Sequence, residues 1–113
     1  MGRKINIKYS FRVYEGAKPY LGPGRIELMQ GIEKFGSIAK AATAMSMSYR
    51  KAWQMVKDLN KISGRPMVEV RLGGKTGGGA SITVFGREAM EKYFALKAKA
   101  DLFFERAVKE VDF

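Results

Sequence analysis

Several residue types that support common protein chemistry are absent from this chain of 113 residues. It contains no cysteine and no histidine, which excludes disulfide bonds, Cys/His metal sites and histidine-dependent catalysis. No apolar run approaches the roughly twenty residues of a membrane span, and no charged-then-apolar signal sequence is visible. We therefore expect a cytoplasmic protein with no metal, no cofactor, no membrane contact and no enzymatic activity.

The composition indicates one globular domain with a modest core, since hydrophobic residues make up 46% of the chain and charged residues 28%. The formal net charge is +10, and it is distributed unevenly. Residues 1–82 carry fifteen basic and five acidic groups, whereas residues 83–113 carry six of each. A basic excess confined to one part of the chain favours a polyanionic partner, although many soluble proteins are also basic.

The pattern of residues 36–62 is typical of a helix-turn-helix, two capped helices joined by a short turn. Ser37 is placed to cap the first helix, because its hydroxyl can accept from backbone N–H groups that the first turn leaves unpaired. Ser48 is placed to cap a second helix over residues 48–62. That helix carries its apolar residues on one face: Ala52, Trp53, Val56 and Leu59.

The beginning of the second helix is polar and basic, as entry into the major groove of DNA requires. Tyr49, Arg50 and Gln54 are candidates to reach base edges, and Ser48 and Lys51 to hold phosphates. The sequence leaves open which of Tyr49, Arg50, Lys51 and Gln54 contact bases and which contact phosphates. The simpler alternative is a solvated helix face, where most charged residues lie. DNA contact is favoured because the helix pattern, the charge distribution and the position on the helix agree.

Two nearby residues also have alternative interpretations. Ser37 is a cap in any case, and the N-terminus of its helix can in addition face a phosphate. Trp53 shares its face with Ala52 and Val56, so we expect it to anchor the helix in the core rather than to stack on a base.

The flanking segments predict the rest of the fold. Residues 5–13 alternate between apolar and polar, which indicates a half-buried strand, and residues 18–21 can return as a second one. Apolar residues at helical spacing predict a helix over residues 25–35, with Gly36 as its left-handed C-terminal cap. The N-terminal strand element thus covers residues 5–21, and a three-helix core covers residues 24–62.

A glycine-rich hairpin follows the helix-turn-helix. Residues 67–72 and 80–84 are predicted strands around the loop 73–79, which is the arrangement of a wing in a winged helix. We expect Arg71, Lys75 and Thr76 to contact the DNA backbone there, because glycines permit close approach to phosphates. The loop lacks the spacing of a nucleotide-binding P-loop; binding of a small oxyanion by its N–H groups remains an alternative.

The last predicted element is a long helix over residues 84–111, with Thr83 as its N-cap. It carries two adjoining apolar stripes, which usually means that one packs in the helix's own domain and the other against a partner. The predicted dimer interface is the first stripe: Ala89, Tyr93, Leu96, Ala100, Phe103 and Ala107.

From Gly24 to about Ala95 the chain resembles the N-terminal domain of the molybdate-responsive transcriptional regulators, the ModE family, and more distantly the LysR-type winged helices. The resemblance lies in GRIELMQGIEKFGSIAKAA, MSYRKAW, MVEVR, GGKTGGGA and ITVFGRE. It implies a winged-helix domain that dimerises through its terminal helix and an N-terminal strand element.

Two departures from the family are informative. Ser46 stands where glycine is usual in the turn, and a left-handed conformation there would cost about 1 kcal/mol. The chain also lacks the C-terminal oxyanion-binding modules of the full-length regulators, so molybdate sensing is not carried over to it.

These observations predict an α+β, mainly helical fold: one winged-helix domain over residues 1–113 with an N-terminal strand or hairpin and a long C-terminal helix. The predicted function is that of a homodimeric transcriptional regulator that binds an inverted repeat in double-stranded DNA. The alternatives are a winged-helix adaptor that binds proteins, and an oxyanion-responsive regulator whose sensing part lies elsewhere.

Overall fold

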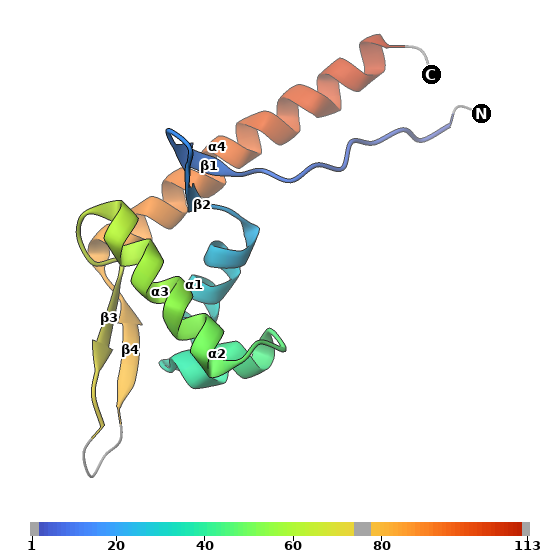
Figure 1. Ribbon diagram of the computed structural model, residues 1–113. Coiled ribbons are helices and arrows are strands. Elements are labelled where there is room, and N and C mark those ends of the chain that lie inside the picture. Colours follow the sequence, from blue (N-terminus) through green and yellow to red (C-terminus); the bar gives the residue numbers. More distant parts are fainter. Residues whose placement is uncertain (1–2, 74–77, 112–113) are drawn as a thin grey trace.

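The computed structural model describes residues 3–73 and 78–111, which form four α-helices and two antiparallel strand pairs (Figure 1). The elements in chain order are β1 (Val13–Glu15), β2 (Lys18–Leu21), α1 (Pro23–Phe35), α2 (Ile38–Ala44), α3 (Tyr49–Ser63), β3 (Val68–Arg71), β4 (Gly79–Ile82), α4 (Val84–Ala107) and a closing 3-10 turn, η1 (Val108–Glu110). The predicted fold class, a mainly helical winged helix-turn-helix, is confirmed.

The core lies where α1, α2 and α3 meet the strands of the wing. Met29 and Ile32 of α1 and Met67 before β3 are fully buried, and Leu28 and Leu59 are almost so. The predicted face of α3 is confirmed, because Ala52 and Val56 also lie in this core, with Trp53 partly buried against it. No described buried side-chain N or O atom lacks a hydrogen-bond partner. The packing of α1, α2 and the wing strands thus holds α3 in a fixed position.

Local capping residues define the helix boundaries as the sequence predicts. Gly36 ends α1 in the left-handed conformation with a φ of 66°, where a side chain would be strained. Ser37 begins α2 by accepting a hydrogen bond from the Lys40 N–H at 3.1 Å. Thr83 caps α4 by accepting from the Gly86 N–H at 2.9 Å. These predicted caps are confirmed.

The wing is a hairpin attached to the helices through β4. In β3–β4, Val68 pairs with Ile82 and Val70 with Ala80. The Ala80 N–H donates to the carbonyl of Gly36 at 2.9 Å, which joins the wing to the corner between α1 and α2. The predicted contact residues Lys75 and Thr76, at the tip, lie outside the described residues.

The predicted strand over residues 5–13 is wrong in extent. Only Val13–Glu15 forms a strand, paired with Lys18–Leu21, and residues 3–12 are extended backbone without strand pairing in the described structure. This N-terminal arm (residues 3–12) runs beside α4 (Figure 1), with the ring of Tyr9 4.9 Å from that of Phe104. Apolar and polar residues alternate along the arm because one side of it faces α4. The arm nevertheless forms no backbone hydrogen-bond ladder with another strand in the described structure.

Helix α4 leaves the core and continues well beyond it. Its 24 residues span about 36 Å, and the molecule is 63 Å long but only 30 and 22 Å across. The first turns are buried through Ala89, Met90 and Tyr93, after which the described part of the helix has no buried residue. None of the described helices is long and apolar enough to span a membrane.

The predicted dimer stripe on α4 requires a correction at its beginning. Ala89 and Tyr93 are only 8% and 4% exposed because they pack in the chain's own core, so they present no surface to a partner. Leu96 and Phe103, further along, are 52% and 65% exposed. The stripe thus starts in the core and emerges into solvent one turn later.

Candidate nucleic-acid interface

The outer face of α3 is the most direct candidate for a nucleic-acid contact. Opposite the buried Ala52, Val56 and Leu59, the helix exposes a polar line along its length. We call this line the α3 outer face; it consists of Arg50, Gln54, Lys57 and Lys61, all exposed. Three cations and an amide on one helical face match what phosphates and base edges recognise.

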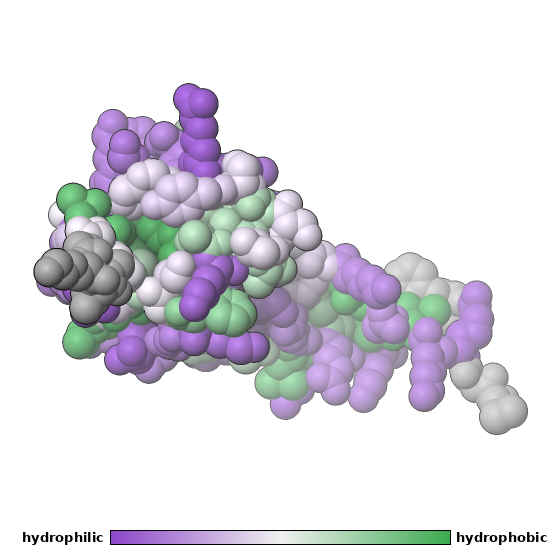
Figure 2. Space-filling view, turned by 90° about the horizontal axis from the view of Figure 1, so that it is seen from below, coloured by the Kyte–Doolittle hydropathy of each residue, from purple (hydrophilic) through white to green (hydrophobic). Residues whose placement is uncertain are grey.

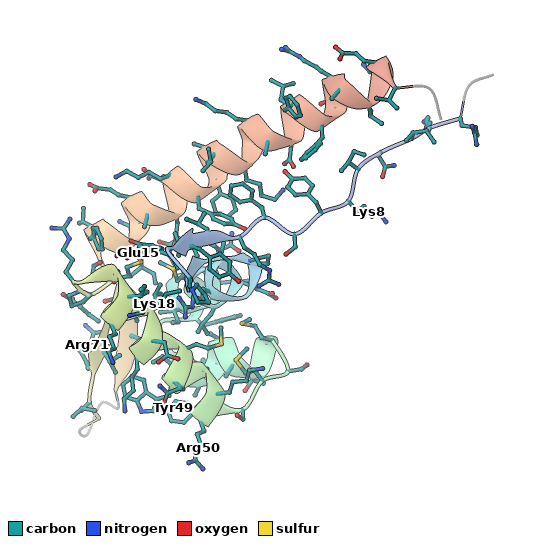
Figure 3. The ribbon with its side chains drawn as sticks, turned by 45° about the horizontal axis from the view of Figure 1, so that its top comes forward. Lys8, Glu15, Lys18, Tyr49, Arg50 and Arg71 are labelled. Carbon is teal, nitrogen blue, oxygen red and sulfur yellow. The ribbon has the colours of Figure 1, made fainter. Side chains whose placement is uncertain are left out.

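The beginning of α3 is held in place by its cap. Ser48 accepts from the Lys51 N–H at 3.1 Å, which confirms the predicted cap. Arg50 projects away from the body of the molecule at the end where α2 and α3 meet (Figure 3). Tyr49 is 52% exposed beside it, and Lys51 is exposed too. The first turn of α3 therefore offers long polar side chains to a ligand outside the protein.

The turn before α3 contains a backbone conformation unusual for its residue type. Ser46 has a φ of 53°, in the left-handed region that favours glycine. Its N–H donates to the Thr43 carbonyl at 3.1 Å, and the Met47 N–H donates to Ala42 at 2.9 Å. Ser46 thus adopts the left-handed conformation whose cost was considered above, and the turn's hydrogen bonds hold it there.

A groove of about 410 Å³ separates the helix-turn-helix from the wing. It lies at the end of the molecule from which the wing projects, shown in Figure 2, where hydrophilic side chains surround paler and hydrophobic ones. The groove brings together predicted contact residues from three elements, namely Ser37, Tyr49 and Arg71. Its other lining residues are Ile38, Ala39, Trp53, Val70, Leu72, Gly73, Gly78, Gly79 and Ala80.

Arg71 is the described cation of the wing. It ends β3, is exposed, and pairs with Gly79 across the hairpin. A Cβ added at Gly79 would lie 3.1 Å from Nη2 of Arg71, so the glycine gives the guanidinium room against the strand. Figure 3 shows Arg71 on the wing, apart from Arg50 at the beginning of α3. A ligand that touches both must span the groove.

The electrostatics of the described residues leave these cations available. The ion pairs between described side chains join Arg87 to Glu33 at 3.2 Å and Lys97 to Asp101 at 2.9 Å. Neither pair involves α3 or the wing. No described group of three or more acidic residues is placed to hold a metal ion. The candidate site is thus a positively charged surface.

The predicted residues fall into four sets. Arg50 and Gln54 share the outer face of α3, whereas Ser37, Tyr49 and Arg71 line the groove. Ser48 and Lys51 lie exposed at the capped beginning of α3. Lys75 and Thr76 lie outside the described residues. The sequence reasoning missed Asp58, whose carboxylate accepts a hydrogen bond from Gln54 at 2.9 Å. The spacing of four residues between glutamine and aspartate on a helix was the available signal.

Comparison with known proteins finds no matching family model. Among curated proteins, the chain is 37% identical over 78 residues to the transcriptional regulator ModE of Haemophilus influenzae, covering 69% of this chain and 31% of that protein. It is 37% identical over 76 residues to the DNA-binding transcriptional dual regulator ModE of Escherichia coli, covering 67% and 29%. The molybdenum-pterin-binding protein MopA of Rhodobacter capsulatus is 42% identical over 69 residues, covering 61% and 26%. The chain thus spans about a third or less of each relative's length.

Solved structures show the same fold. The chain in the CbnR_DBD–DNA complex matches with a TM-score of 0.56 at 16% identity, covering 77% of this chain and 94% of that one. The full-length LTTR LysG from Corynebacterium glutamicum matches with a TM-score of 0.56 at 24% identity, covering 80% and 31%.

Proposed function

This chain is related to the ModE transcriptional regulators through its winged-helix region, and from that relationship we propose that it binds double-stranded DNA sequence-specifically and regulates transcription. The observation that carries the proposal is the exposed α3 outer face beside a groove that Arg71 lines from the wing. In this arrangement α3 enters the major groove, while Ser37, Arg71 and the wing contact the phosphate backbone. The role is that of a binding protein in the cytoplasm rather than of an enzyme.

The exposed part of α4 supports a homodimer as the DNA-binding form. Leu96 and Phe103 are half exposed or more, and Ala100 and Ala107 lie partly buried on the same side of the helix. A stripe of this kind on a helix that projects from its domain is suited to a second copy. The balanced charge of residues 83–113 also avoids repulsion between two such helices. A twofold axis through this stripe would present two α3 helices to an inverted repeat.

The test is selection of bound fragments from a random duplex pool, followed by titration of the selected duplex at several salt concentrations. We expect an enriched inverted repeat and an affinity that falls steeply with salt, because phosphate contacts release counterions. An adaptor that binds proteins would enrich no sequence and show little affinity at moderate salt. That result would refute the proposal.

The same assay addresses regulation by an oxyanion. Titration in the presence and absence of molybdate compares the affinity of this chain for its selected duplex. We expect no change, because the proposed function assigns any sensing to a separate part or polypeptide. A shift in affinity with molybdate would place sensing within this chain.

A further inference from the structure

The orientation of the Gln54 side chain is determined by a neighbour on the next turn of α3. Its Nε2 lies 2.9 Å from Oδ1 of Asp58, and both side chains are exposed. A carboxylate can only accept hydrogen bonds, so the atom that faces it must be the amide nitrogen. The Gln54 carbonyl oxygen Oε1 is therefore turned away from Asp58, and one N–H remains to donate elsewhere.

Asp58 is an unexpected residue at this position. It is the one acidic residue in residues 37–62, among five basic ones. Among the described residues Asp58 forms no ion pair, and its side-chain hydrogen bond is with Gln54. A carboxylate beside a phosphate-facing surface weakens binding to every duplex. A Gln–Asp pair at this spacing adds only slightly to helix stability, which does not explain the location.

We propose that Asp58 is a positioning residue that holds Gln54 to read adenine in the major groove. The amide of Gln54, on the same face as Arg50, then presents Oε1 and its remaining N–H together. These are the acceptor and donor that match N6 and N7 of adenine, the base that glutamine recognises through two hydrogen bonds. The inference rests on the proposed function. It means that Asp58 increases the preference of the protein for its specific site and lowers its affinity for DNA of any sequence.

The experiment compares four variants of the full chain with the wild type: Gln54→Ala, Asp58→Ala, Asp58→Asn and Glu91→Gln. Asparagine at position 58 removes the charge and can either accept from or donate to Gln54, so it no longer determines which end of the Gln54 amide faces it. Glu91 is an exposed carboxylate on α4, so Glu91→Gln controls for a change of one unit in net charge. Circular dichroism first establishes that each variant is folded, as expected for exposed positions.

Each protein is titrated with the selected duplex, with versions in which each half-site position is changed to the other three bases, and with random duplex. In the wild type we expect one position to prefer adenine by about tenfold or more. Gln54→Ala and Asp58→Ala should both lose most of this preference at that same position. Asp58→Asn should keep only part of it, because asparagine can bond to either end of the Gln54 amide. Both Asp58 variants should bind random duplex more tightly than Glu91→Gln does.

The outcomes distinguish the role of Asp58 from the proposed DNA binding itself. If Asp58→Ala shifts all duplexes equally and leaves the adenine preference intact, Asp58 acts only through its charge and the inference is wrong. A preference for cytosine at the position lost in Gln54→Ala would overturn the assignment of adenine. If the wild type shows no salt-dependent binding to any duplex, the proposed function itself fails.

Discussion

Asn60 of α3 forms hydrogen bonds with both the N–H and the C=O of Val68 in β3. The side-chain Nδ2 donates to the Val68 carbonyl at 2.9 Å, and Oδ1 accepts from the Val68 N–H at 3.2 Å. The same Oδ1 accepts from the Met67 N–H at 2.9 Å. One amide thus connects the end of the candidate recognition helix to the start of the wing.

Replacement of Asn60 should destabilise the fold. Asn60→Ala leaves the N–H groups of Met67 and Val68, in a partly buried region, without a partner. We expect the free energy of unfolding to fall by about 1–3 kcal/mol. Asn60→Asp keeps the acceptor, so its loss should be smaller. Urea unfolding followed by the fluorescence of Trp53, the single tryptophan, measures both; a wild-type value for Asn60→Ala would contradict the role.

Two glycines in helices should respond oppositely to alanine. A Cβ at Gly86 would lie 2.4 Å from the Met67 carbonyl oxygen, so Gly86→Ala forces the backbone apart and should cost about 1–3 kcal/mol. At Gly24 the nearest atom is Cε of Met55 at 3.8 Å. Gly24→Ala should therefore stabilise by about 0.5 kcal/mol, because it restricts the unfolded chain. Urea midpoints of the pair check the prediction, which fails if both shift in the same direction.

Arg50 and Lys75 should affect DNA binding in different ways. Arg50→Ala is expected to relax base preference at one half-site position, since an arginine at the beginning of a recognition helix contacts base edges. Lys75→Ala is expected to weaken binding to all duplexes and to reduce the salt slope by about one. Titrations with selected and random duplex measure both, with Lys92→Ala on α4 as control. Equal losses on the two duplexes for both variants would contradict this division of roles.

The exposed stripe of α4 should control the oligomeric state. Phe103, 65% exposed, is expected to be covered in a dimer, so Phe103→Glu should shift the protein to monomer in sedimentation velocity experiments. Ala98→Glu places the same charge at an exposed position outside the stripe and should leave the dimer intact. A wild-type protein that stays monomeric at high concentration would refute the dimer proposal.

The attachment of the arm should depend on pH through Tyr9. The Tyr9 hydroxyl donates to Asp101, which raises the pKa of Tyr9 to about 12 and lowers the pKa of Asp101 below its usual value. The unfolded tyrosine has a pKa of 10.0. The contribution of neutral Tyr9 is therefore complete below pH 10 and is lost as the pH rises from 10 toward 12. That of ionised Asp101 is present above about pH 4 and is lost at lower pH.

NMR titration of the Tyr9 Cζ resonance measures this shift directly. Asp101→Ala removes both the hydrogen bond and the charge, so the pKa of Tyr9 should move down toward 10. An unchanged Tyr9 titration in the variant would show that Asp101 does not hold the arm.

Features encoded by neighbouring residues could be predicted from the sequence. The caps Ser37, Ser48 and Thr83 bond to backbone within three residues, and Gly36 ends α1 through its own φ. Such interactions depend on residue type and position alone, so local patterns suffice to locate the helices.

Features that depend on distant partners could not be predicted in the same way. The alternation of residues 5–13 shows that one side is apolar, but not whether a strand or a helix covers it. Asn60 binds backbone eight residues away, and Tyr93 donates from α4 to the carbonyl of Phe11 at 2.9 Å. The apolar stripe on α4 likewise does not show at which residue the helix leaves the core and becomes exposed, which is between Tyr93 and Leu96.

The hydrogen bond from Ala80 to the Gly36 carbonyl has a consequence for the partner. It fastens β4 to the corner that positions the helix-turn-helix, while Asn60 fastens β3. In the proposed complex, the distance between the side chains of α3 that read bases and the wing residues that contact phosphates is therefore fixed. A duplex whose groove width does not match that distance must deform to bind. If the proposed function holds, the local stiffness of the DNA therefore contributes to which duplexes this protein prefers.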